Sequence, residues 1–161
     1  MRTAAAADLS AITRIYNQGV EDRVATLEAD EKSESDVEAW LWGSEDRSQM
    51  VVAEADGEVA GWAAYRPYSH RCAHAGVAEI SIYVERTARG HGVGERLLAA
   101  LEELARSRGV RKLVLFALPG NRAGRALYDK RRFREVGVFE EHGRLDGTLH
   151  DVLIMEKLLQ P

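Results

Sequence analysis

Three glycines at alternate positions, Gly90, Gly92 and Gly94, lie between an apolar strand-like run and a leucine-rich helical pattern. Ordered glycine loses more conformational entropy than other residues, so this group marks either a flexible connection or a backbone that must approach a ligand closely. Bare backbone N–H groups beside the positive end of a helix suit a pyrophosphate. Residues 89–95 therefore predict a phosphate-binding loop, with an ordinary turn into a helix as the competing interpretation.

Two familiar phosphate-loop patterns are absent from this segment. The dinucleotide fingerprint requires a third glycine where Glu95 stands, and the Walker pattern requires a Gly-Lys-Ser/Thr ending. What remains is Arg89-x-x-Gly92-x-Gly94 at the start of a helix. This short pattern alone does not decide between a turn and a pyrophosphate site.

Glu79 is the residue of the preceding run, 77–84, that could carry proton transfer. Alternation places it with Ser81 and Tyr83 on one face, opposite an apolar face. A free α-amine is largely protonated near neutral pH and must lose a proton before it attacks a thioester. A carboxylate on the binding face can take that proton directly or through water. Alternation alone equally fits a glutamate that faces solvent.

The first half of the chain predicts two helices and a hairpin that would support this site. Asp8 is a good N-cap for the first helix, and residues 35–38 have the pattern of a capping box for a second, short one. Strand-like runs at 50–55 and 58–65 are joined by Asp56-Gly57, a strong hairpin signal.

The second half alternates strands and helices. We expect a strand at 77–84, a leucine-rich helix ending before Gly109, an apolar strand at 112–118 buried on both faces, a helix capped by Asn121 and reaching about 131, and strands at 135–139 and 152–157. This order implies an α/β fold, in which a mixed sheet carries helices on both faces.

Composition restricts the class of protein. A chain of 161 residues, 45% hydrophobic and 30% charged, fits a single domain over 1–161. The net charge of -4 implies no general affinity for nucleic acid. A basic cluster within 122–134 is most simply a solvated helix face, with a minor part in holding an anionic cofactor as the alternative.

Cys72 is the single cysteine, so no internal disulfide framework is expected. The N-terminal residues are too weakly apolar for a signal peptide, and no run reaches membrane-span length. We therefore expect a cytoplasmic protein with no membrane partner. His70, Cys72 and His74 alternate along the chain, but their spacing matches no standard zinc pattern, so no metal is expected.

These segments, together with Asn121-x-x-Gly-x-x-Leu-Tyr128, resemble the GCN5-related N-acetyltransferase (GNAT) superfamily. Its hallmark Gln/Arg-x-x-Gly-x-Gly/Ala grips the pyrophosphate of acetyl-CoA. The resemblance implies a mixed, mostly antiparallel twisted sheet with a central splay. Residues 78–84, 20–26 and 145–152 look like the phosphinothricin acetyltransferase branch, and residues 71–79 bring the chain closest to members that acetylate arsinothricin.

The resemblance also implies residues that contact acetyl-CoA. They are Ile82, Tyr83 and Val84 on the strand, Arg89, Gly90, His91, Gly92, Val93, Gly94 and Glu95 in the loop, and Asn121 and Lys130 beyond it. Each also has a simpler interpretation: sheet pairing for the strand residues, a helix N-cap for Asn121, and a solvated side chain for Lys130.

In the resembled branch, the glutamate at position 79 is the general base. Tyr128 lies about two helical turns after Asn121 and can protonate the departing thiolate, although phosphinothricin enzymes often have histidine there and a packed core tyrosine is the alternative. Arg71 matches a substrate arginine of the branch, with a surface loop residue as the alternative. Arg66 and His74 are weaker candidates of the same kind.

The resulting hypothesis is direct acetyl transfer, in a ternary complex, to the amine of a small amino acid analogue of the phosphinothricin, arsinothricin or methionine sulfone type. The resemblance also implies a homodimer. The alternatives are acetylation of protein N-terminal or lysine amines, and a non-catalytic acyl-CoA sensor. Arg131-Arg132-Phe133 departs from the family's usual Leu-Gly-Phe, and the sequence offers no account of it.

Overall fold

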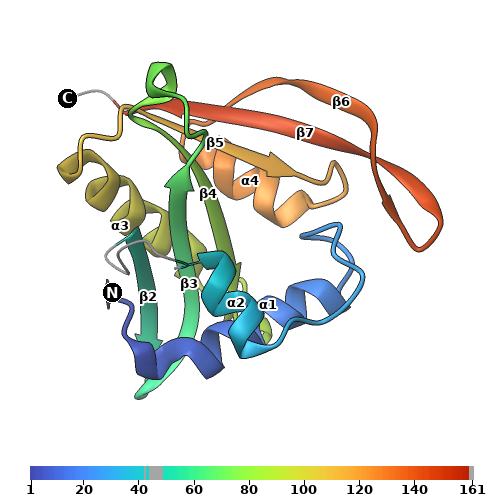
Figure 1. Cartoon of the computed structure of the whole chain (residues 1–161). Helices are drawn as coiled ribbons and strands as arrows, with labels where there is room; N and C mark the ends of the chain where they lie inside the picture. The colour runs from blue at the N-terminus through green and yellow to red at the C-terminus, as the bar shows by residue number, and fades with distance from the viewer. Residues whose placement is uncertain (42, 44–48, 160–161) are drawn as a thin grey trace.

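The computed structural model describes residues 1–41, 43 and 49–159. Its seven strands form one sheet in the order β1-β2-β3-β4-β5-β7-β6 (Figure 1). The strands are β1 (Arg2–Thr3), β2 (Met50–Ala55), β3 (Glu58–Pro67), β4 (Val77–Val84), β5 (Lys112–Ala117), β6 (Arg134–Leu145) and β7 (Thr148–Leu158). Only β4 and β5 run parallel among these pairs, so the described sheet is mixed and mostly antiparallel, as expected.

Helices cover both faces of the sheet. They are α1 (Leu9–Glu21), α2 (Glu34–Leu41), α3 (Val93–Ser107) and α4 (Arg122–Lys130), with short 3-10 turns η1 (Ala6–Asp8), η3 (Cys72–His74) and η4 (Arg86–Ala88). Ile12 and Ile15 of α1 pack with Trp62 of the sheet in one core. Leu97 and Leu101 of α3 belong to a second core. The predicted α/β arrangement is confirmed.

The parallel pair β4–β5 opens in the middle of the sheet. β4 pairs with β3 along its whole length, but its pairing with β5 ends at Glu79 and Val114. Both strands continue beyond this point, to Val84 and Ala117. The splay implied by the resemblance is therefore present, and it begins at the predicted base.

Two caps differ from the sequence prediction. The capping box of α2 is built by Ser33 and Asp36, because each side chain bonds the other's backbone N–H, at 3.2 and 3.0 Å. The predicted box at 35–38 is thus two residues too late. The Asp8 carboxylate makes no side-chain cap on α1; it accepts from the Ala5 N–H at 2.7 Å and pairs with Arg2.

The C-terminal strands are much longer than predicted. They form a hairpin that turns at Asp146 and Gly147, which both adopt the positive φ of a tight Asp-Gly turn, 49° and 81°. In Figure 1 this hairpin (orange to red) extends beyond the rest of the sheet and over the segment between α1 and α2. β5 is also not buried on both faces, since Phe116 is 38% exposed.

The unusual Arg131 has a partner inside the fold. Glu102 of α3 is buried and accepts hydrogen bonds from Arg131 at 2.6 Å and Lys157 at 2.8 Å. These ion pairs join the end of α4 to α3 and β7. Arg132 adopts a φ of 62°, in the left-handed region that favours the glycine usual at this position in the family. Nothing in the structure explains the arginine.

Candidate active site

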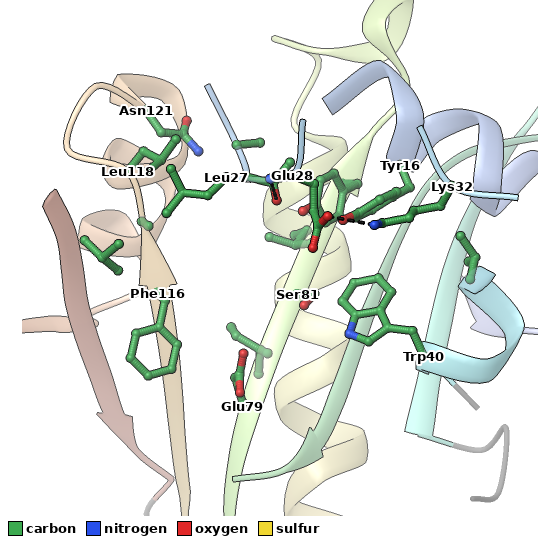
Figure 2. A pocket seen from close by; sticks show the side chains of 18 of the residues that line it. Tyr16, Leu27, Glu28, Lys32, Trp40, Glu79, Ser81, Phe116, Leu118 and Asn121 are labelled. Atoms are coloured by element: carbon green, nitrogen blue, oxygen red, sulfur yellow. Dashed lines mark hydrogen bonds and ion pairs between the residues drawn. The ribbon is translucent and has the colours of Figure 1, made fainter. Parts of the chain in front are cut away.

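A cavity of about 810 Å³ lies where β4 separates from β5 (Figure 2). Its wall combines side chains from α1, the segment 22–33, α2, β4, β5 and the start of α4. The site is thus assembled from segments distant in sequence.

Glu79 points into this cavity, near Phe116 in Figure 2. It lies directly across the β3–β4 pair from Arg66, and one guanidinium nitrogen is 3.7 Å from its carboxylate. The Arg66 guanidinium also stacks over the ring of Trp40, at 5.1 Å from the centroid. Arg66 is therefore held beside the predicted base, and both side chains are about one-third exposed.

The backbone of β4 offers free groups toward the splay at alternate residues. Val77 C=O and the Glu85 N–H both bond across to the β3 side, so the odd-numbered residues face β3. By alternation Ile80 and Ile82 direct their backbone groups toward the gap with β5. Ile82 is therefore the best placed of the three predicted strand residues.

Tyr83 and Val84 are already engaged in contacts within the protein. The Tyr83 ring stacks on Trp62 at 4.9 Å and lies 5.0 Å from Tyr16, and burial raises the pKa of its phenol. Its backbone, being odd-numbered, faces β3. The Val84 C=O already accepts from Nε of Arg89 at 3.1 Å.

The glycine loop has the conformation that its sequence predicts. Gly90 and Gly92 adopt φ values of +79° and +75°, and a Cβ on either would meet nothing within 4 Å. Gly92 is the N-cap residue of α3, and Val93, the first residue of the helix, is buried in the core. His91 is exposed. Gly90 and Gly92 are thus required by backbone conformation rather than by packing, and they leave open space in front of a helix N-terminus. Gly94 differs, because a Cβ there would lie 3.1 Å from the Leu127 side chain.

The charged residues around this loop are tied to neighbouring elements. Arg89 donates to Asp22 at the end of α1, at 2.5 Å. Burial would raise the pKa of Asp22, but hydrogen bonds from Arg89 and Arg86 outweigh it and hold that pKa below its usual range. Glu95 pairs with Lys130 at 2.6 Å, which links the start of α3 to the end of α4.

Asn121 and Tyr128 both line the cavity. Asn121 is the N-cap of α4, and its side-chain oxygen accepts from the Gly124 N–H at 2.9 Å. The amide nitrogen has two further N–H groups to offer a ligand. Tyr128 is buried, and desolvation raises its pKa to about 12, so its phenol stays protonated at neutral pH.

Two predicted substrate residues lie apart from this cavity. Arg71 precedes η3, where its backbone N–H bonds the Ser69 hydroxyl at 3.2 Å. The His74 ring packs against Tyr68 with centroids 5.6 Å apart. Neither is among the described residues that line the cavity, whereas Arg66 contacts Glu79.

The sequence analysis missed cavity residues in the segment after α1. Glu28 and Lys32 line the cavity and pair with each other, and Tyr16 and Trp40 complete this wall. No periodic pattern marks residues 22–33, so only the spacing of four between Glu28 and Lys32 could have suggested a pair.

A model of the family described as "Acetyltransferase (GNAT) family" matches residues 12–133. The chain belongs to this family. It is therefore an N-acetyltransferase, and acetyl-CoA is its cosubstrate. The open β4 edge, the glycine loop and Asn121 provide backbone and amide groups that fit the cofactor's arm and pyrophosphate.

Three similar proteins cover nearly all of this GNAT chain. A Pseudomonas aeruginosa protein named L-methionine sulfoximine/L-methionine sulfone acetyltransferase is 31% identical, over 100% of this chain and 95% of its own. A phosphinothricin acetyltransferase structure from Sinorhizobium meliloti, in complex with AcCoA, has a TM-score of 0.87 and 30% identity, covering 98% and 86%. A ribosomal-protein-alanine N-acetyltransferase structure from Brucella melitensis has a TM-score of 0.89 and 36% identity, covering 98% of both chains.

Proposed function

We propose that this GNAT enzyme acetylates the amine of a small amino acid analogue of the phosphinothricin, arsinothricin or methionine sulfone type. Transfer is direct, within a ternary complex, and Glu79 is the general base. The observation that carries the proposal is the position of the Glu79 carboxylate, which projects into the cavity where β4 leaves β5. The names of the Pseudomonas and Sinorhizobium relatives support the substrate class.

In this mechanism Glu79 takes a proton from the acceptor ammonium, directly or through water, and the neutral amine attacks the thioester carbon. The nitrogen–carbon bond forms, the carbon–sulfur bond breaks, CoA leaves as a thiolate, and the nitrogen releases its second proton to solvent to give the neutral amide. The glycine loop and the Ile82 backbone hold the cofactor so that attack is effectively unimolecular.

Tyr128 acts at the departing sulfur. Its pKa of about 12 lies above the pKa of about 8.5 of a thiol, so complete proton transfer from the phenol to a thiolate is unfavourable. We propose that the phenol donates a hydrogen bond to the sulfur as negative charge develops, and that solvent protonates the thiolate later.

Arg66 is the best placed of the predicted substrate residues, because it already lies 3.7 Å from Glu79. Its planar guanidinium suits a phosphinate, arsinate or carboxylate. Arg71 and His74 do not line the cavity, so the proposal gives them no direct contact in this conformation.

The Brucella neighbour favours a second candidate function, acetylation of a protein N-terminal alanine. A thiol-release assay with acetyl-CoA distinguishes the two when it compares methionine sulfone and phosphinothricin with alanine-starting peptides. We expect turnover of the amino acids. Turnover of the peptides alone would support the second function.

Glu79→Gln tests the mechanism in the same assay. We expect kcat to fall by about 10²- to 10⁴-fold, because proton removal by a positioned base contributes that much, while acetyl-CoA affinity is retained. Glu58→Gln is the matched control, since Glu58 is an exposed strand glutamate outside the cavity. Wild-type rates in Glu79→Gln across the pH range would exclude Glu79 as the base. A wild type that binds acetyl-CoA but shows no turnover with any acceptor would instead favour the acyl-CoA sensor alternative.

We also propose that two copies of the chain pair through β6. This long edge strand exposes Val136, Val138 and Phe139. Edge strands that present apolar side chains are readily paired by another chain, and a twofold contact covers both copies at once. Light scattering after gel filtration should give a dimer for the wild type and a monomer for Val138→Lys.

A further inference from the structure

The segment between α1 and α2 is a fixed wall of the cavity. Arg23 adopts a φ of 56° and turns back on the segment, donating to the carbonyls of Glu28 and Ala29 at 3.2 and 2.8 Å. Its guanidinium also lies 3.2 Å from Asp146 at the hairpin turn. Glu28 is further held by its N–H, which bonds the Thr26 hydroxyl at 3.1 Å.

Lys32, at the end of this wall, has its backbone clamped by one side chain. The Asn17 amide of α1 donates to the Lys32 C=O and accepts from the Lys32 N–H, both at 2.9 Å. Ser33, the next residue, caps α2. The point from which the Lys32 side chain departs is therefore determined by two helices.

The Lys32 ammonium lies inside the cavity, 2.7 Å from the Glu28 carboxylate (Figure 2). The hydrogen bond that the Lys32 ammonium donates to Glu28 raises the pKa of Lys32, so the lysine is charged at neutral pH. An ammonium has three N–H donors, and Glu28 uses one of them. Two donors remain for a ligand.

The Lys32 ammonium is a cation in a cavity whose other described charged side chains are acidic. Four carboxylates line the cavity, those of Glu28, Glu31, Asp36 and Glu79, and Lys32 is the single basic residue among its described lining residues. Arg66 lies at the Glu79 end of the cavity, where it pairs with that carboxylate, so an acceptor carboxylate at the other end has Lys32 as its cation.

The order of side chains along β4 suits such an acceptor. Glu79 and Ser81 share one face of the strand, about 7 Å apart. In Figure 2 the Lys32–Glu28 pair lies beyond Ser81 from Glu79. An α-amino acid placed over Ser81 has its nitrogen toward the base and its carboxylate toward the ammonium.

We propose that Lys32 binds the α-carboxylate of the acceptor, with Glu28 holding the ammonium in position. This inference rests on the proposed function, because it assigns specificity within the same cavity. It makes Lys32 the residue that distinguishes an amino acid from a simple amine.

The test compares methionine sulfone with 3-(methylsulfonyl)propylamine, the same acceptor without its carboxylate, for the wild type, Lys32→Met and Lys32→Arg. Losing one charge-assisted contact should raise the KM for methionine sulfone about 10- to 100-fold in Lys32→Met, with kcat little changed. The kcat/KM should change far less for the decarboxylated amine than for methionine sulfone, because only the amino acid loses a contact with the ammonium. Lys32→Arg should retain most of the preference for the amino acid.

An unchanged KM for methionine sulfone in Lys32→Met, or equal losses for both acceptors, would overturn the assignment of Lys32 while leaving the proposed function intact. A wild-type enzyme that binds acetyl-CoA in a thermal-shift assay but acetylates neither acceptor would overturn the proposed function, and the Lys32 inference with it. Thermal unfolding of each variant verifies that the fold is retained.

Discussion

Replacing Gly92 with alanine should cost this enzyme both stability and affinity for acetyl-CoA, whereas the same change at Gly109 should cost stability alone. The two glycines have nearly equal φ values, +75° and +79°, and a Cβ at either position meets nothing within 4 Å. The left-handed conformation costs a residue with a Cβ about 1–2 kcal/mol, and no clash adds to it. Each variant should therefore unfold about 2–8 °C below the wild type.

The difference between the two variants lies in what faces the new methyl group. Gly92 caps α3 in the proposed pyrophosphate loop, whereas Gly109 follows the other end of that helix. We expect the KM for acetyl-CoA to rise at least about tenfold in Gly92→Ala, equivalent to about 1.4 kcal/mol, and to stay unchanged in Gly109→Ala. Differential scanning calorimetry measures the loss of stability that both variants should share. Steady-state kinetics measures the KM for acetyl-CoA, which should rise in Gly92→Ala alone. Equal KM values in the two variants would refute the assignment of the loop.

Three further outcomes follow from contacts in the fold. Glu102→Gln should lower the free energy of unfolding by about 3 kcal/mol in urea denaturation, because it leaves the surrounding cations without their buried partner; a loss below about 1 kcal/mol would show that they reach solvent. Gly124→Ala should destabilise the protein by about 1 kcal/mol, since a Cβ there would lie 2.7–2.9 Å from the Asn121 cap and displace it; an unchanged melting temperature would contradict this. The hydrogen bond from Arg2 holds the pKa of Asp8 below its usual range, so this carboxylate stabilises the fold above about pH 4 and that contribution is lost as the pH falls through the lowered value. Asp8→Asn should therefore flatten the acid limb of a stability–pH curve, and an identical curve would exclude the contribution.

Local sequence patterns were sufficient to predict the secondary structure at the centre of the fold. The alternation of 77–84, the leucine spacing of α3 and the glycines at 92 and 109 each have one physical interpretation, and the structure has the corresponding strand, helix and turns. The face of β4 on which Glu79 lies depends on the same alternation, whereas the splay was expected from the family resemblance alone. These features are short-range, so the sequence carries them directly.

Features that depend on partners distant in sequence could not be predicted. Two overlapping capping boxes are possible at 33–38, and the structure forms the first. The charged residues 140–150 lack alternation, and they form strands because β6 and β7 pair with each other. Lys32 depends on Asn17, fifteen positions earlier, and no local rule connects them.

The hairpin and the acceptor wall also share an evolutionary constraint. The Leu27 side chain occupies the space that any Cβ at position 143 would need, and Arg23 joins the same wall to Asp146. Most substitutions in this part of the hairpin therefore displace the wall that carries Glu28. A substitution at Gly143 or Asp146 that reshapes the hairpin should therefore also shift the proposed acceptor wall, which links the proposed dimer strand to the proposed acceptor site.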